Sequence, residues 1–357
     1  MKKIFTMLLL GIYLPFMFAC GNETPDNPDD NPTDNPGEII PPNNEPTEYD
    51  LYLEELNEIV SVEKGKIFER YDDFTDEPKN FMYFGDYPGR VITNEDLIKE
   101  LDKITTTNEF GYIEFENLSF IKVTIENTYD SLEIGDEAFE NYTKFEIGST
   151  HYFLVEPLLW RVLTYNPETD KAFLISNNIV DAQMFVNETS DRFIDGRVIY
   201  PSNYEYSDVR KWCNNEFYQQ AFTAGEKNMI PLTSINNQYI NYFSNHIYDK
   251  DTEDYVFLPS YKEMTSKTYG YETSGIFSYS RFSEPTDYAS AKGVYTSSLE
   301  EDIPSSGLYL LRSGLDHVRS YAYFVKFDGY SLNPYYVNSP STGVRVCIKP
   351  IIPDAEK

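Results

Sequence analysis

The sequence predicts an α+β fold of mixed short helices and antiparallel strands. Period-two apolar alternation and helical apolar stripes both occur, each in short segments spread along the chain. These segments do not follow the regular strand–helix alternation of a parallel, doubly wound sheet. An apolar content of 41% over 357 residues is sufficient for a hydrophobic core. We therefore expect one globular α+β region at residues 49–357.

The first 20 residues resemble the signal segment of a bacterial lipoprotein. Lys2 and Lys3 precede an apolar run, Ile4 to Phe18, which is too short to span a bilayer comfortably. Ala19 stands directly before Cys20, as in the lipobox of that class, although the two residues before Ala19 depart from it. The resemblance implies cleavage before Cys20 and acylation of its thiol and amine. An ordinary signal peptide is the alternative.

Residues 21–48 are predicted to form an extended, acidic tether. The segment is rich in Pro, Asn and Asp and has no aromatic residue, so it cannot build a core. The formal net charge of the whole chain is −30, which argues against binding to nucleic acid and against electrostatic attachment to anionic lipids. We therefore expect the domain to stand on the outer face of a bacterial cytoplasmic membrane, attached through the lipidated Cys20.

Apolar spacing orders the elements of the globular region. In the N-terminal half we expect helices at 53–60 and after a capping box at 93–96, and strand pairs at 111–126 and at 152–165 with 172–176. Pro157 marks an edge position or a bend in the longest of these strands. In the C-terminal half we expect one helix at 208–222 and another at 286–292. Two short helices are expected to begin at the capping boxes at 223–226 and 260–263. Strands are expected at 255–258 and within 307–350.

Eight short motifs occur in an order that resembles the bacterial domain-of-unknown-function family 6273 between residues 80 and 350. They are F-M-Y-F-G-D-Y-P (81–88), Y-F-L-V-E-P-L-L-W-R-V-L (152–163), F-L-I-S-N-N-I-V-D-A (173–182), Y-S-D-V-R-K-W-C-N-N-E-F-Y-Q-Q-A-F (206–222), V-F-L-P-S-Y-K-E (256–263), T-D-Y-A-S-A-K-G (286–293), Y-L-L-R-S (309–313) and G-V-R-V (343–346). The family implies no activity. Its ending is similar to C-type-lectin-like domains, including the formylglycine-generating-enzyme type, which implies a C-type-lectin-like C-terminal region with ligand-binding loops.

The tyrosine-rich C-terminal segment is the predicted binding surface for a glycan or protein ligand. The candidate ligand-binding tyrosines lie on one face of a predicted strand and in the loop after it, and they are Tyr321, Tyr323, Tyr330, Tyr335 and Tyr336. Tyrosine combines a large apolar face with a polar tip, which suits such surfaces. The family resemblance implies that the neighbouring Y-L-L-R-S and G-V-R-V strands mainly serve as framework. We therefore expect the ligand to bind the outward-facing tyrosines and the loops at 314–320 and 328–342.

Arg312 and Arg345 are further candidate ligand-binding residues. Each lies inside an apolar strand, where an unpaired charge is costly. Either they pair with acids such as Asp208 or Asp287 and hold strand ends together, or they face a ligand carboxylate or sugar.

Cys213 and Cys347 are the only cysteines after Cys20. The resembling family usually has Leu and Pro-Ala at these two places, so both cysteines depart from it together. Either they form a disulfide, which would stabilise the fold by about 3–5 kcal/mol, or they are two buried free thiols.

No motif of a hydrolase, a phosphate-binding loop or a dinucleotide site is present. His151, His246 and His317 stand in unrelated contexts, and residues 249–254 begin like a calcium loop but lack the glycine and the late Glu that it requires. We therefore predict no catalytic residue, metal or cofactor. The expected function is a non-enzymatic binding module. The alternatives are a structural or assembly component of the cell surface and a surface hydrolase that uses Asp and Glu pairs.

Overall fold

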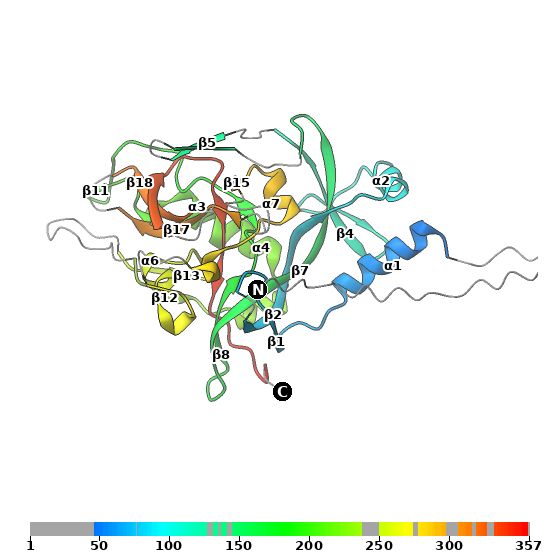
Figure 1. Ribbon diagram of the computed structural model, residues 1–357, viewed down its shortest axis with the longest axis horizontal. Coiled ribbons are helices and arrows are strands. Elements are labelled where there is room, and N and C mark those ends of the chain that lie inside the picture. Colours follow the sequence, from blue (N-terminus) through cyan, green and yellow to red (C-terminus); the bar gives the residue numbers. More distant parts are fainter. Residues whose placement is uncertain are drawn as a thin grey trace, which may run out of the picture. The chain divides into compact units, whose positions relative to one another are not determined.

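The main sheet is organised around one long strand, β7 (Thr150–Asn166), in the computed structural model of the chain (Figure 1). It pairs with β2 (Pro78–Val91) along one side, and with β4 (Leu118–Thr124) and then β8 (Lys171–Ser176) along the other. Pro157 lies where the second side changes partner from β4 to β8. The edge or bend predicted at this proline thus corresponds to a gap in strand pairing, where a proline is best tolerated in a sheet.

The structure describes residues 46–75, 77–126, 131–134, 137–140, 145–237, 250–273, 278–297, 306–315, 319–326 and 332–355. The predicted signal segment and nearly all of the tether lie outside these ranges. The candidate ligand-binding Tyr330 and the predicted lipidation site Cys20 also lie outside them, as do His246 and His317.

The main sheet contains eight of the described strands, and all of its neighbouring pairs are antiparallel. Its remaining strands are β1 (Ile67–Tyr71), β3 (Tyr112–Phe115), β14 (Val256–Phe257) and β21 (Cys347–Ile348). The strand pairs predicted at 111–126 and from 152 to 176 are confirmed as β3–β4 and β7–β8.

A second sheet holds most of the C-terminal segment. In spatial order its described strands are β19 (Leu332–Tyr336), β18 (Tyr321–Val325), β17 (Tyr309–Gly314), β20 (Gly343–Val344) and β9 (Asp181–Ala182). Among the described strands, only the β17–β20 pair is parallel. Two-stranded ladders are formed by β5 (Ser131–Ile134) with β6 (Glu137–Glu140), β10 (Arg192–Ile194) with β11 (Arg197–Ile199), β12 (Thr233–Ile235) with β13 (Thr252–Asp254), and β15 (Thr296–Ser297) with β16 (Ser306–Gly307). Short helices between mostly antiparallel strands confirm the α+β prediction.

Two chain segments pass from one sheet to the other side by side. The first leads from β8 into β9, and the second leads from β20 into β21. Their main chains are joined where Val180 N donates to Val344 O at 2.9 Å. Gly343 lies in this crossing, and a Cβ there would come within 2.5 Å of the Ile179 side chain and 2.8 Å of Leu308 O. The crossing segment at Ile179 and the main chain before β17 therefore pack so closely against Gly343 that only glycine fits at this position.

The helices are short, and all of those described except the one at Tyr218–Ala221 begin after a residue whose side chain caps them. They are α1 (Glu48–Val60), α2 (Glu95–Leu101), α3 (Asp208–Trp212), α4 (Tyr218–Ala221), α5 (Ala224–Met229), α6 (Tyr261–Met264) and α7 (Asp287–Ala291), with 3₁₀ turns at Tyr204–Tyr206, Lys267–Tyr269 and Tyr279–Arg281. The capping boxes predicted at 223–226 and 260–263 are confirmed. At α2 the cap is instead Asn94, whose side chain accepts from Asp96 N and Leu97 N. None of the helices described is both long and apolar enough to cross a bilayer.

The helix predicted at 208–222 contains one wide turn. α3 and α4 are joined by a π-helical segment, Cys213–Phe217, so the three pieces form one continuous helix. Its apolar stripe is buried as expected, because Val209, Trp212 and Phe217 pack into the main core. A π turn rotates the side chains that follow it relative to a regular helix, and such turns are frequent at functional sites.

A second, smaller core lies under α1 and α2, which cover part of β4 and β7 (Figure 1). Leu56 of α1 and Leu97 of α2 are buried there against Phe120 and Leu154. The N-terminal helices are thus packed onto the same sheet that carries the C-terminal strands β14 and β21.

Candidate functional site

The predicted tyrosines are divided between the two faces of β18 and β19. Tyr321 lies directly opposite Tyr336, and their ring centroids are 4.7 Å apart at a steep angle. Tyr335 lies opposite Ala322 on the other face, where its ring packs edge-on against Phe324 at 5.4 Å. The rings of Tyr335 and Tyr336 are 5.6 Å apart. The four aromatic rings of Tyr321 and Phe324 in β18 and of Tyr335 and Tyr336 in β19 form a chain of contacts across the two outer strands at this end of the sheet, which we call the aromatic edge.

The members of the predicted tyrosine set differ sharply in exposure. Tyr336 is 52% exposed, and Tyr321 and Tyr335 are half-buried. The hydrogen bond that Tyr321 shares with Tyr336, followed by partial burial, raises the pKa of Tyr321 to about 12. Tyr323 is buried, with its ring 4.9 Å from that of Tyr261. It faces the core because the alternation of β18 places it beside buried Val325, so it does not present its ring to solvent.

Arg312 is buried and forms a two-pronged ion pair with Glu263 of α6. Nη1 donates to Glu263 Oε2 at 2.6 Å and Nη2 donates to Oε1 at 3.0 Å, while Nη1 also donates to Leu258 O. Burial alone would raise the pKa of Glu263, but the charge of Arg312 and hydrogen bonds from Arg312 and Ser260 lower that pKa overall. The paired acid is therefore the helix-capping Glu263, not Asp208 or Asp287 as we expected.

Arg345 is also buried, and its guanidinium binds main chain and a tyrosine. Nε and Nη2 donate to Ser176 O at 3.0 and 2.8 Å, and Nη1 donates to the Tyr309 hydroxyl at 3.3 Å. Of the acids expected as its partners, Asp208 pairs with Lys211, and Asp287 accepts from Val91 N. Both predicted arginines thus act within the framework, away from the aromatic edge.

Cys213 and Cys347 are both free and both buried. Cys213 opens the π-helical segment of the helix, and Cys347 lies in β21. Burial raises the pKa of each thiol, so both are protonated at neutral pH. The structure therefore has the second of the two expected arrangements, two buried thiols.

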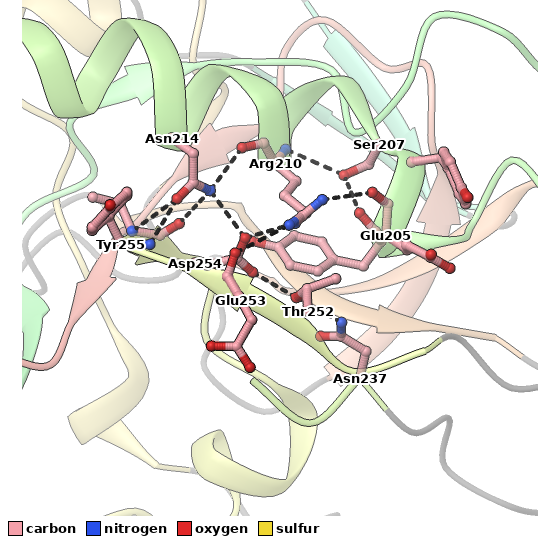
Figure 2. A network of polar contacts seen from close by, with 12 residues as sticks. Glu205, Ser207, Arg210, Asn214, Asn237, Thr252, Glu253, Asp254 and Tyr255 are labelled. Atoms are coloured by element: carbon pink, nitrogen blue, oxygen red, sulfur yellow. Dashed lines mark hydrogen bonds and ion pairs between the residues drawn. The ribbon is translucent and has the colours of Figure 1, made fainter. Parts of the chain in front are cut away.

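A network of polar side chains ties the helix to β13 and centres on Asp254 (Figure 2). The Asp254 carboxylate is fully buried and accepts from Arg210 Nε at 2.7 Å, from Thr252 Oγ1 at 2.6 Å and from Asn214 Nδ2 at 3.3 Å. Burial raises the pKa of Asp254, and the bonds from Thr252 and Arg210 oppose that rise. The carboxylate has partners on both oxygens, so we assign it to the framework.

Asn214 is the member of this network that the π turn positions, and Figure 2 shows it pointing from the helix towards the strand. Its Oδ1 accepts from Tyr255 N at 2.8 Å and from Val256 N at 3.3 Å, while its Nδ2 donates to Val256 O at 2.9 Å. The amide thus replaces a strand partner for the main chain between β13 and β14. A side chain with one donor and one acceptor end is required for this role.

A cleft of about 280 Å³ opens between β2 and β7. Its walls are mainly apolar and aromatic, and its polar lining includes Arg90 and Glu156, which are joined by a 2.6 Å ion pair. Gly89 makes room for that pair, because a Cβ there would lie 1.9 Å from Glu156 Oε1. Burial raises the pKa of Glu156, and Arg90 opposes this. Among the residues that line the cleft, Glu156 is the only acid, so the lining holds no acid–base pair.

Sequence reasoning missed this cleft and two further buried arginines, Arg161 and Arg281. The signal for Arg161 was present, since it lies inside the apolar run 152–163 just as Arg312 and Arg345 lie inside theirs. The cleft had no comparable signal, because its walls come from segments far apart in the sequence. Within the described ranges, no three His, Cys, Asp or Glu side chains gather in a group able to hold a metal ion.

Comparison with protein families gives one match. A model described as "Domain of unknown function (DUF6273)" matches residues 169–349, from the turn before β8 to the end of β21. The matched range is shorter than the range of 80–350 expected from the motifs, since it leaves out β2 and β7. No curated protein and no solved structure matched the chain. The match covers just over half of the 357 residues, and the chain therefore belongs to the DUF6273 family.

Proposed function

We propose that this protein is a non-enzymatic binding module that recognises a glycan or a protein through its aromatic edge. The observation that carries the proposal is the Tyr336 ring, which is 52% exposed yet held in place by Tyr321. An aromatic ring fixed before binding loses little conformational entropy when a ligand covers it. Its polar hydroxyl and flat apolar face suit both sugar rings and protein side chains.

The proposal extends to where the protein works. The lipobox-like end of residues 1–20 supports lipidation of Cys20 and a location on the outer face of a bacterial cytoplasmic membrane. The acidic tether that follows would hold the aromatic edge away from the bilayer, because like charges and prolines extend a chain. The similarity of the L-R-S and G-V-R strands to C-type-lectin-like domains supports a ligand surface near the C-terminus.

A structural or assembly component of the cell surface is the second candidate. It is favoured by the β10–β11 hairpin, where Phe193 and Val198 lie opposite each other and are 76% and 41% exposed. An exposed apolar pair on a hairpin is a typical contact for another protein chain. A surface hydrolase has less support, because Arg90 already holds the one acid that lines the cleft.

The test is to measure binding of the full chain to glycan and protein arrays and then to compare two substitutions. Tyr336→Ala removes the exposed ring of the aromatic edge, and we expect it to weaken binding by about tenfold or more. Tyr71→Ala is the matched control, because Tyr71 is 66% exposed at the end of β1. Equal binding by wild type and both variants would refute the aromatic edge as the site. A loss of self-association in Phe193→Ser, without any array ligand, would favour the assembly role.

A further inference from the structure

A polar pocket of about 250 Å³ lies where β2 and β7 diverge. The pairing of these strands ends at Phe81 opposite Arg161. Beyond that point the pocket is lined by Lys79 and Asn80 of β2 and by residues 161–163 of β7. The turn ending at Gly270 closes another side. Arg161 thus stands at the point where the two strands separate, with its side chain among the lining residues.

The guanidinium of Arg161 is buried but only partly satisfied. The residue is 4% exposed, and its guanidinium donates to Ser280 O at 3.1 Å and to Tyr269 O at a marginal 3.5 Å. A guanidinium has five N–H donors, so most of them are left over. Among the described residues, no carboxylate forms an ion pair with it, whereas Arg312 in a similar strand position has Glu263. An unpaired buried charge is costly, which favours an anionic partner at this place.

Gly270 keeps one end of this guanidinium open. It has a φ of +75°, and a Cβ at this position would lie 2.9 Å from Arg161 Nη2. On another side, the guanidinium carbon is 5.0 Å from the centre of the Tyr271 ring. The aromatic face orients the planar group, and the missing side chain at Gly270 leaves space beside Nη2.

Two more cations share this face of the sheet. Arg70 lies opposite Lys79, and Phe81 lies opposite Arg161, so alternation along β2 places all four side chains on one face. The acids that pair with Arg70 and Lys79 are Asp73 and Glu77, whose side chains are 55% and 65% exposed. Glu69 also lines the pocket, but it alternates to the opposite face of β1.

We propose that this pocket is a binding site for a small oxyanion, either a free anion or the charged group of a larger ligand. Arg161 would bind it from the inner end through its free donors, and Lys79 would bind it at the mouth, exchanging its exposed partner Glu77 for the ligand. The volume is below that of ordinary drug-sized sites, so the bound part is small. Planar carboxylates and tetrahedral phosphate or sulfate groups share the required charge and acceptors. This site is separate from the aromatic edge and does not depend on it.

The experiment is calorimetric titration of the full chain with sodium phosphate, sulfate, acetate and glucuronate, with sodium chloride at equal ionic strength as the reference. Lys79→Gln should weaken oxyanion binding by about tenfold, the usual effect of losing one charged contact. Lys99→Gln is the matched control, because Lys99 forms a similar ion pair with Asp96 on α2, away from the pocket. It should bind like wild type, and so should Tyr336→Ala.

Arg161→Lys tests the inner end of the pocket, since it keeps the charge but loses the planar fork. We expect it to bind at least tenfold more weakly, with near-ultraviolet circular dichroism used to establish that it is folded. If Arg161→Lys does not fold, the comparison of Lys79→Gln with Lys99→Gln still tests whether the pocket binds the oxyanion. Preference for phosphate and sulfate, or for acetate and glucuronate, identifies the class of anion. Absence of heat with all four anions, or equal binding by Lys79→Gln and wild type, would overturn the proposal.

Discussion

Arg345 donates two hydrogen bonds to the main-chain oxygen of Ser176, from Nε at 3.0 Å and from Nη2 at 2.8 Å. Ser176 is the last residue of β8, and Arg345 lies between β20 and β21. The two bonds therefore join the pair of chain segments that pass between the sheets. Because Nη1 also reaches the Tyr309 hydroxyl in β17, a single side chain connects both sheets at their junction.

Arg345→Lys should reduce the free energy of unfolding by about 3 kcal/mol, because hydrogen bonds from charged groups contribute about 1.5–3 kcal/mol each and the ammonium reaches fewer acceptors. Urea unfolding followed by fluorescence measures the change. Arg319→Lys is the control, since Arg319 is largely exposed beside Asp191, and its effect should stay within about 0.5 kcal/mol. Equal effects of the two substitutions would show that the junction does not depend on the guanidinium.

Glu263→Gln should destabilise the protein by about 3–5 kcal/mol at neutral pH, because it leaves Arg312 buried without its counter-charge. The pKa of Glu263 is lowered from its ordinary 4.5, so the pair stabilises the fold fully above pH 4.5. That contribution is lost as the pH falls through the lowered pKa. The difference between wild type and variant should therefore shrink in acid, which urea unfolding across a pH series measures. For Glu100→Gln, which breaks an exposed pair with Lys103, we expect at most about 1 kcal/mol at any pH.

Asn214→Asp should cost about 3 kcal/mol at neutral pH, because it removes the donor to Val256 O and places a second carboxylate beside Asp254. The pKa of Asp254 is already raised by burial, and two adjacent carboxylates cannot both ionise easily. The variant should therefore lose stability more steeply than wild type as the pH rises above 3.8, the ordinary Asp value. Thermal unfolding of wild type and variant across a pH series measures this loss. Asn215→Asp, on the exposed side of the same π turn, should have little effect in these measurements. A similar loss in both variants would contradict this account.

The two thiols of the folded part should be unreactive in the native protein and reactive after unfolding without any reductant. Burial excludes the reagent, and it also raises the pKa of both Cys213 and Cys347, which keeps them protonated. Alkylation followed by peptide mapping distinguishes these two cysteines from Cys20. Labelling of the Cys213 and Cys347 peptides only after reduction would instead reveal a disulfide.

Local patterns were sufficient for most of the elements. The helix at 208–222 and the capping boxes at 223–226 and 260–263 depend on spacings of three or four residues, which the sequence displays directly. The strand pairs β3–β4 and β7–β8 follow from alternation with a short turn between the members. The cap of α2 was predicted one position too early, because the structure has Asn94 as the cap where the sequence indicated Thr93.

Contacts between distant segments were not predictable in the same way. The buried state of Arg312 followed from its apolar neighbours, but its partner Glu263 is distant in sequence and had already been assigned to a capping box. The face of the sheet on which each tyrosine lies depends on the register between β18 and β19, because a shift of one residue moves each ring to the opposite face. Tyr335 and Tyr336 therefore point to opposite sides, although the sequence presents them as one aromatic pair.

The position of β7 outside the matched residues 169–349 has a consequence for which part of this chain could fold by itself. The matched unit begins just before β8, a strand whose neighbour β7 lies before that unit. Cut out alone, this unit would expose the edge of β8 to pairing with other chains. In this protein, β7 covers that edge and completes the sheet beside β8. The segment that matches the family model and the folding domain of this protein are therefore different lengths of chain.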